Sequence, residues 1–289
     1  MKSLTKENCV LEYSANNPPA LKIASGETFQ LETPSILTHP ELLPDKTTVP
    51  VTGPIFLEHA VQGDVLKVDI LKIQLTAGEG AIVAKPGKGA FGDRIIEPTV
   101  KVVPYDDKYA YFSEKIKVPL RPMVGKIGVA PLGVSIDSHI PGAHGGNMDI
   151  TDINEGSSVY LPIFVDGALL ACGDVHAVMG DGESEFSALE TEASLTLRCQ
   201  VVKGMELTQP MVVSTGKIMT VGQGRTLEEA CNIALDDMVE LITSKLGLEF
   251  IDAVMLISIA ADLKINQIVN TLVGVRLALS LSLLPLGNL

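Results

Sequence analysis

Short segments in which apolar and polar residues alternate, separated by glycine and proline, constrain the fold of this chain more than any other feature of its sequence. In residues 194–201 the apolar side chains Leu195, Leu197 and Cys199 fall on one face, which is the period of a β-strand. The 26 glycines and 17 prolines supply turns between such segments. Three other apolar runs, bounded by Gly, Pro or Asp, are typical of buried strands: residues 159–165, 169–172 and 211–214.

A second alternating segment, residues 65–75, contains an irregularity. Its apolar phase switches between Ile70 and Leu71. One extra residue in a strand produces such a switch, so we expect a β-bulge or a bend at this point.

Two segments have the periodicity of helices. The first begins at Thr226 as N-cap, with Glu229 completing a capping box and Gly247 ending the helix. The second covers about residues 250–260 and is apolar on nearly all sides, so we expect it to be buried.

The order of these elements predicts a mainly β (α+β) fold. We expect a β-sandwich or barrel-like body over residues 1–220, with an α+β segment, residues 221–289, in which the helix pair and strands pack on that body. The sequence contains no evident repeat or low-complexity linker, so we expect the two parts to form one compact unit.

The charge balance excludes one class of partner. The net charge of −13 leaves no basic stripe that could release counterions from nucleic acid, and the chain is not expected to bind it. The four cysteines show no CxxC spacing and the first residues are polar, which predicts a reduced, cytoplasmic protein with free thiols.

The most apolar stretch, residues 272–286, is interrupted by Arg276 and Pro285 and is shorter than the roughly 20 apolar residues of a membrane span. From Val275 its apolar residues alternate as in a strand. Because an exposed strand edge invites pairing with a second copy, we expect a homodimer and no membrane insertion.

The glycines Gly87, Gly89 and Gly92 form a GxGxxG string. In a dinucleotide-binding fold this string opens a helix directly after a strand, whereas here it runs into a short β-branched stretch that ends in proline. We interpret it as a glycine-rich loop over an active site.

The chemistry-bearing residues gather between residues 141 and 190. A glycine-rich turn presents His144, Asn147 and Asp149. The structural alternative is that Asn147 and Asp149 only satisfy backbone groups of the turn. A turn built for geometry alone, however, does not require a histidine, an amide and a carboxylate together.

A second segment adds Cys172, Asp174 and His176, which we expect on one face of a strand. An Asp-x-His pair on a rigid strand can supply two metal ligands, or it can be a hydrogen-bonded polar pair at a strand end. Further carboxylates follow at Asp181, Glu183 and Glu190. Such a concentration of titratable groups indicates a functional site.

These residues resemble the acetamidase/formamidase family. The similarity covers about residues 20–276 and rests on two signatures, HGGNMD at 144–149 and GDVHAVMGDGE at 173–183. The resemblance implies a mostly β fold with a jelly-roll-like part, and hydrolysis of short amides such as formamide or acetamide to a carboxylate and ammonia. Some relatives are zinc-dependent, and some open cyclic amides, so a lactam hydrolase is the alternative on the same site.

On this basis we expect His144, Asp174 and His176 to hold Zn²⁺, with Glu190 or Asp149 completing or supporting the shell. We group Glu183, Asn147 and Asp149 as catalytic residues. Glu183 is the expected general acid/base, and Asn147 is expected to hold the substrate carbonyl.

Two other chemistries compete with this hypothesis. In one, Cys172 is the nucleophile and His176 its base. In the other, the chain is a non-catalytic metal-binding β module whose carboxylates hold a structural Ca²⁺. A second, structural ion such as Ca²⁺ among Asp181, Glu183 and their neighbours is compatible with the catalytic hypothesis.

Overall fold

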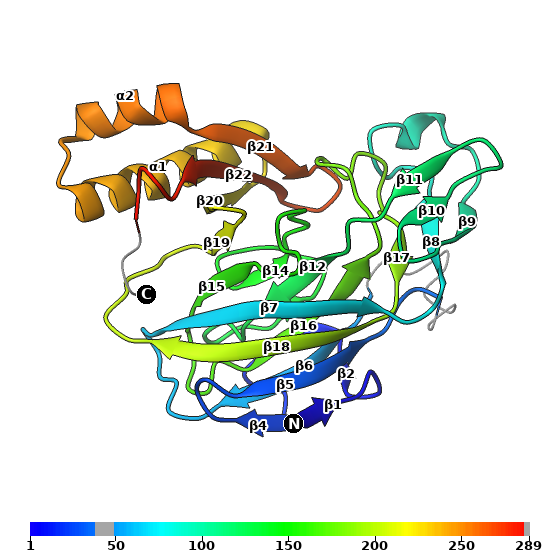
Figure 1. The fold of residues 1–289 in the computed structure, drawn as a ribbon, viewed down its shortest axis with the longest axis horizontal. Helices are drawn as coiled ribbons and strands as arrows, with labels where there is room; N and C mark the ends of the chain where they lie inside the picture. Colours follow the sequence, from blue (N-terminus) through cyan, green and yellow to red (C-terminus); the bar gives the residue numbers. More distant parts are fainter. Residues whose placement is uncertain (38–48, 286–289) are drawn as a thin grey trace.

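Two nine-stranded sheets face each other across the main hydrophobic core in the computed structural model, which describes residues 1–37 and 49–285 (Figure 1). The predicted mainly β fold with a helix pair near the C-terminus is confirmed. Both sheets are open in the described residues, so the sandwich-like body is confirmed and the barrel-like alternative is wrong.

The first sheet runs from the N-terminal strand to the C-terminal hairpin. Its strands, in spatial order, are β1 (Lys2–Leu4), β5 (Thr28–Thr33), β18 (Ala193–Val202), β7 (Val65–Leu75), β15 (Ser158–Pro162), β19 (Met211–Ser214), β20 (Lys217–Gly224), β22 (Val273–Ser280) and β21 (Asp262–Gln267).

The second sheet carries the residues of chemical interest. Its main path is β14 (Gly145–Asn147), β12 (Met123–Gly128), β16 (Leu170–His176), β17 (Glu190–Thr191), β8 (Glu79–Ala84) and β9 (Thr99–Pro104). A branch adds β6 (Val51–Leu57), β2 (Cys9–Val10) and β4 (Leu21–Ile23). Two small pairs lie outside both sheets: β10 (Tyr109–Tyr111) with β11 (Lys117–Pro119), and β3 (Glu12–Tyr13) with β13 (Ile136–Asp137).

The alternation in residues 194–201 became β18, whose buried residues Leu195, Leu197 and Cys199 face the core. The predicted bulge is also confirmed. Thr196 lies opposite Lys72 while Leu197 lies opposite Ile70, so that Leu71 is the extra residue of β7.

The helix α1 (Leu227–Leu246) has the predicted ends. The Thr226 hydroxyl accepts from the Glu229 N–H at 3.1 Å, and Gly247 takes a left-handed conformation with φ of 66°. A short segment connects α1 to α2 (Phe250–Ala260); α1 packs on β20 and β22, and α2 packs on α1 and β22.

The expected burial of residues 250–260 is wrong. Only Ala253 and Ile257 of α2 are buried, while Phe250, Ile251 and Ile259 are exposed. The helix covers an outer edge of the fold and contacts it along one stripe, so its other apolar residues meet solvent (Figure 1). Among the described helices, none combines the length and apolar character needed to cross a bilayer.

The strand that begins near Val275 is not an exposed edge. β22 pairs with β20 on one side and with β21 on the other, so the edge of this sheet is β21. Pairing of a second copy through β22, expected from the apolar alternation, is therefore wrong. The homodimer itself stays a prediction.

Candidate active site

Five of the residues singled out in the sequence converge beside β16. Asp149, His176 and Glu183 form one group, and Asp174, His176 and Glu190 form another, with one side-chain ligand atom of each residue within 4.8 Å of the others in its group. All five side chains are buried. We call these five residues the acidic cluster.

Strand pairing places two members of the acidic cluster opposite each other. His176 at the end of β16 pairs with Glu190 of β17 on one side and with Met123 of β12 on the other. This register brings His176 Nε2 to 3.2 Å from Glu190 Oε2 and 3.9 Å from Asp174 Oδ1.

Asp149 reaches the acidic cluster through the backbone of β12. Its N–H donates to the Gly125 carbonyl at 3.2 Å. A Cβ on Gly125 would lie 2.6 Å from Asp149 Oδ1 and 3.0 Å from His176 Cε1, so only glycine leaves room for both side chains. A glycine in this strand is therefore a requirement of the site.

Three carboxylates of the acidic cluster lie on strained backbone. Asp149, Asp174 and Glu183 have φ of 50°, 57° and 39°, in the left-handed region that residues with a Cβ rarely adopt. Each such conformation costs on the order of 1 kcal/mol and persists where the surrounding structure enforces it, commonly at functional sites.

Two polar side chains orient the carboxylates. The Lys126 ammonium lies 3.4 Å from Asp174 Oδ2 and donates to the Val49 carbonyl at 2.9 Å. The Asn147 amide satisfies all its neighbours when its nitrogen donates to Asp149 Oδ2 and Asp174 Oδ2, each at 3.2 Å, and its oxygen accepts from Asn270 Nδ2 at 2.9 Å. The amide of Asn147 is thereby fully engaged.

The carboxylates differ in proton affinity. Burial, reinforced by the neighbouring charge of Asp149, raises the pKa of Glu183 well above its usual range, and burial raises the pKa of Glu190 to about 7. Burial likewise raises the pKa of Asp149 to about 6, against the attraction of His176. Burial acts in the same sense on Asp174, but Lys126 and His176 outweigh it and hold the pKa of that residue below its ordinary value.

His176 supplies the test of whether this site suits a metal. Both ring nitrogens are buried and have no aligned hydrogen-bond partner, although Glu190 lies within ion-pair distance of Nε2. Burial opposes protonation of the ring, but Glu190 and the other carboxylates outweigh it and raise the pKa of His176 to about 9. An imidazole whose Nδ1 is buried without a hydrogen-bond partner, set among four buried carboxylates with Lys126 as an adjacent cation, is a donor set that fits a divalent ion such as Zn²⁺.

His144 belongs to neither group of the acidic cluster. Its ring packs edge-on against Tyr13, with 5.1 Å between centroids, and its Nε2 is buried without a hydrogen-bond partner. Burial lowers the pKa of His144 to about 4, so the ring is neutral. Metal ligation by His144 stays a prediction that these contacts do not support.

Cys172 lies away from the acidic cluster, in the core between the two sheets, and is fully buried. Its expected position on the same face as Asp174 and His176 is wrong, because the left-handed φ of Asp174 interrupts the strand alternation. Burial raises the pKa of the Cys172 thiol well above its usual range. The structure therefore argues against a thiolate nucleophile at this position.

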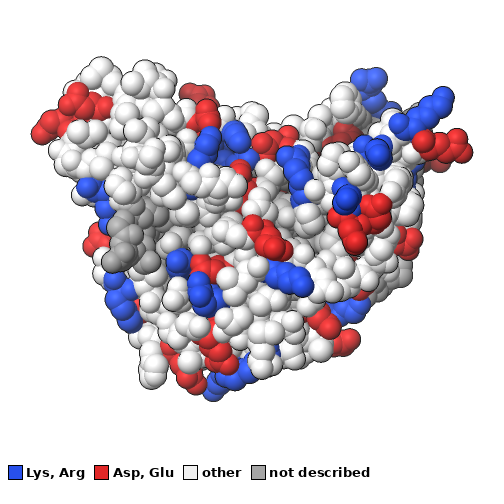
Figure 2. Space-filling model, in the orientation of Figure 1, with Lys and Arg blue, Asp and Glu red and all other residues white. Residues whose placement is uncertain are grey.

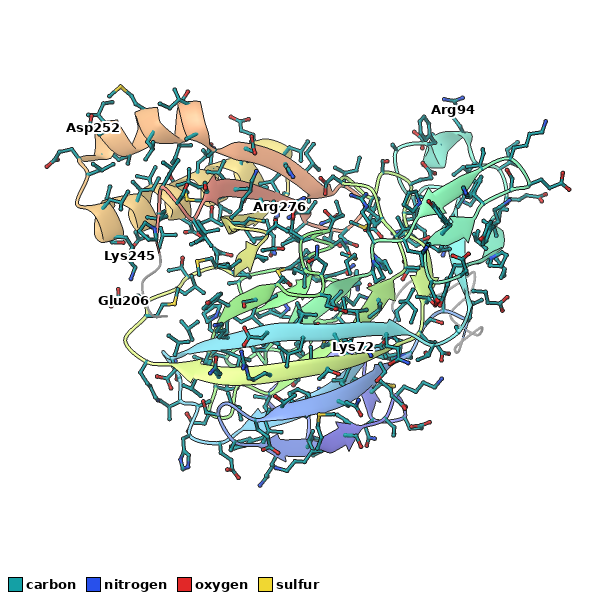
Figure 3. The ribbon with its side chains drawn as sticks, viewed as in Figure 1. Lys72, Arg94, Glu206, Lys245, Asp252 and Arg276 are labelled. Atoms are coloured by element: carbon teal, nitrogen blue, oxygen red, sulfur yellow. The ribbon has the colours of Figure 1, made fainter. Side chains whose placement is uncertain are left out.

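The C-terminal hairpin holds the segment that carries Glu183. The Gly182 N–H donates to the Asn266 carbonyl at 2.9 Å, and the Ile268 N–H donates to the Gly182 carbonyl at 3.1 Å. Arg276 (Figure 3) is fully buried on β22. It donates to Asp181 Oδ1 at 2.8 Å and to Asp152 Oδ2 at 2.7 Å. Asp181 is thus already paired with a cation and is a poor candidate for a Ca²⁺ ligand.

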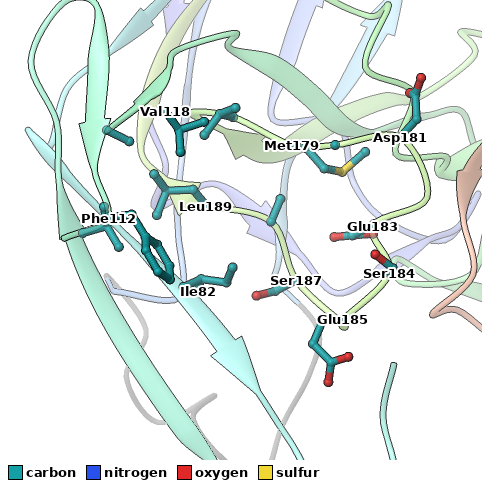
Figure 4. A pocket seen from close by; sticks show the side chains of 15 residues that line it. Ile82, Phe112, Val118, Met179, Asp181, Glu183, Ser184, Glu185, Ser187 and Leu189 are labelled. Atoms are coloured by element: carbon teal, nitrogen blue, oxygen red, sulfur yellow. The ribbon is translucent and has the colours of Figure 1, made fainter. Parts of the chain in front are cut away.

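A pocket of about 280 Å³ opens beside the acidic cluster, and Glu183 is one of its lining residues (Figure 4). Figure 2 shows the molecular outline indented between the helical unit and the region of β8 to β11. The glycine-rich loop contacts the same segment: the Ala90 N–H donates to the Ser184 carbonyl at 2.8 Å, and the Phe91 N–H donates to Glu185 Oε2 at 3.1 Å.

The sequence interpretation missed several residues of this site. Lys126 was detectable as a lysine in the otherwise apolar run of β12, where a buried ammonium needs a carboxylate partner. Asn270 and the apolar side chains of the pocket wall could not be recognised from their neighbours in the sequence, because only long-range contacts bring them to the site.

Comparison with known proteins gives one consistent group of relatives. The model of the acetamidase/formamidase family matches residues 135–282. A Schizosaccharomyces pombe protein designated a formamidase is 28% identical over 255 residues, and that match covers 64% of this chain and 62% of the relative. The chain thus spans less than two thirds of the length of that relative.

Solved structures match over nearly the whole chain. A predicted acetamidase/formamidase from Thermoanaerobacter tengcongensis has a TM-score of 0.92 and 39% identity, with 96% of this chain and 95% of that chain covered. An acetamidase from Bacillus halodurans has a TM-score of 0.93 and 36% identity, with 97% of each chain covered.

Proposed function

We propose that this chain, which belongs to the acetamidase/formamidase family, hydrolyses the C–N bond of small primary amides and uses a divalent metal held by the acidic cluster. The observation that carries the proposal is the convergence of His176 with four buried carboxylates beside an open pocket. A buried excess of negative charge is costly unless protons or a cation balance it, and hydrolysis of an amide uses both.

Amide hydrolysis makes specific demands on a site. A C–O bond forms between water and the carbonyl carbon, the C–N bond breaks, and the nitrogen leaves as ammonia after it gains a proton. The site must accept a proton from water, stabilise the oxyanion and return a proton to nitrogen.

Asp174, His176 and Glu190 are the proposed metal ligands, with Asp149 beside them. When bound, Zn²⁺ would lower the pKa of water to about 7 and polarise the carbonyl. Lys126 and Asn147 hold Asp174 in place and limit the repulsion between Asp174 and Asp149. We therefore assign Asn147 a positioning role instead of the expected contact with the substrate carbonyl.

Glu183 is the proposed proton carrier. It lines the pocket and lies within reach of Asp149, and burial raises its pKa, which favours the protonated form. From this position it delivers a proton to the departing nitrogen, while Asp149, whose pKa of about 6 favours the carboxylate at neutral pH, accepts one from water.

The direct test is ammonia release from formamide, acetamide and longer primary amides, measured alongside the metal content of the purified protein. We expect ammonia release, its loss on dialysis against a chelator, and its recovery on addition of Zn²⁺. Full turnover by metal-free protein would overturn the metal assignment, and treatment with a thiol alkylator, expected to have no effect, tests the Cys172 alternative.

Replacement of Glu183 by glutamine is expected to lower kcat by about 100-fold or more, because the amide keeps the shape of the side chain but cannot transfer its proton. KM and metal content are expected to change little, and the matched variant Glu185→Gln, on the same segment, controls for loss of charge. A kcat within twofold of the parent would rule out Glu183 as proton carrier.

A further inference from the structure

The pocket beside the acidic cluster has a wall that amide hydrolysis itself does not explain. Opposite Glu183, the lining side chains Ile82, Phe112, Val118 and Leu189 are apolar (Figure 4). They come from β8, the β10–β11 region and the segment before β17. The pocket thus pairs one acidic side with a hydrocarbon side.

The volume exceeds what the smallest amides fill. A cavity of about 150 Å³ lined by Leu, Ile and Phe holds a benzene molecule. The pocket here measures about 280 Å³, so formamide or acetamide would leave most of its apolar surface in contact with water. Ligand pockets normally bury most of the surface of the molecule that they bind.

The ionisable side chains among the described lining residues are all acidic. Asp181 and Glu185 contribute carboxylates, Glu183 contributes the proposed proton donor, and no lysine or arginine is among the described lining residues. The Asp181 carboxylate is paired with Arg276, whose guanidinium is buried outside the lining. A substrate whose acyl group ends in a carboxylate would therefore place that charge against the apolar wall and near the Glu185 carboxylate, and would lose hydration without a cationic partner among the described lining residues.

We propose, on the basis of the amidase function above, that the preferred substrates are uncharged primary amides whose acyl group carries an aliphatic or aromatic substituent of about six carbons, seated against Ile82, Phe112 and Leu189. Phe112 is the specificity-determining side chain. Phe112 is 40% exposed, and the Lys101 ammonium lies 4.5 Å from the centroid of its ring.

Kinetics on a graded set of amides tests this proposal. We expect kcat/KM for ammonia release to rise from acetamide through butyramide to hexanamide or phenylacetamide, by at least about tenfold across the series, because each buried methylene adds binding. The hexanamide analogue that ends in a carboxylate is expected to fall at least about tenfold below hexanamide.

The outcomes separate the two proposals. A kcat/KM that is highest for formamide or acetamide and falls with chain length leaves the amidase function standing and overturns the substrate class. A carboxylate-terminated amide that equals hexanamide overturns the charge argument. Absence of ammonia from every amide of the series overturns the amidase function and this inference with it.

Phe112→Ala provides the matched structural test. It is expected to lower the ratio of kcat/KM for hexanamide to that for acetamide by about tenfold. Ile96→Ala, a residue 90% exposed and outside the lining, is the control and is expected to leave the ratio unchanged. A general loss of folded protein lowers both rates together, so an unchanged ratio in Phe112→Ala contradicts the assignment even if the variant is unstable. Val118→Ala gives a second, independent variant of the same wall.

Discussion

Replacement of His176 by alanine is expected to abolish metal binding and turnover together. His176 is the residue common to both groups of the acidic cluster, and its ring nitrogens have no aligned partner of their own. Polarisation by a metal contributes several kcal/mol to hydrolysis, and each 1.4 kcal/mol is a factor of about ten, so we expect kcat/KM to fall by at least about 10³-fold. Elemental analysis and ammonia release measure the two losses.

His144→Ala is the matched comparison for this variant. Both histidines are buried, but His144 packs against Tyr13 and belongs to neither group of the acidic cluster. The His144 variant is therefore expected to keep its metal. Equal metal content in His176→Ala and the parent, or loss of metal from the His144 variant with retention in the His176 variant, would contradict the ligand set.

Replacement of Arg276 by methionine is expected to lower the free energy of unfolding by about 2 kcal/mol, because a hydrogen bond to a charged group contributes about 1.5–3 kcal/mol and the carboxylates left behind, on Asp152 and Asp181, are 19% and 40% exposed and regain water. Arg276 is fully buried, and its loss removes the hydrogen bonds that it donates to Asp152, Asp181 and the Asn266 side-chain oxygen, although Asp181 keeps the one from the Thr151 hydroxyl. Chemical denaturation measures the change. We also expect kcat to fall by about tenfold, because Glu183 follows Asp181 by two residues and depends on the same segment.

Lys217→Met controls for charge removal in the same part of the fold. Lys217 pairs with Asp262 at 2.7 Å, but the two side chains are 38% and 61% exposed. An exposed pair of this kind contributes at most about 1 kcal/mol. Equal destabilisation by the two replacements would show that the Arg276 network does not stabilise the fold beyond an ordinary surface ion pair.

Local patterns in the sequence predicted the elements well. The alternation of β18, the bulge at Leu71 and both ends of α1 follow from neighbouring residues alone, and each is confirmed. The burial of α2 was wrong because its apolar composition does not say how much of the fold is available to cover it.

The site was predicted in part. Asp149, Asp174, His176, Glu183 and Glu190 do converge, as two glycine-flanked signatures indicated. The place of Cys172 was not predictable, because the left-handed backbone at Asp174 changes which side chains share a face. That of His144 was not predictable either, because its ring packs on Tyr13, which is distant in the sequence. Asn270 enters through the C-terminal hairpin, which no local pattern encodes. Lys126 was detectable as a lysine in an apolar run, but its place beside Asp174 follows only from strand register.

The hydrogen bonds from Arg276 to Asp152 and Asp181 have a consequence for folding during synthesis. All residues of the acidic cluster lie at or before position 190 in the sequence. The segment that carries Glu183, however, forms hydrogen bonds with residues 266–276, which are synthesised later. A chain still on the ribosome before residue 276 has emerged cannot complete that segment, since distant contacts form after the loops between them close. We expect activity to arise only late in synthesis, because an unfinished chain contains the residues of the acidic cluster but lacks the hairpin that supports the Glu183 segment.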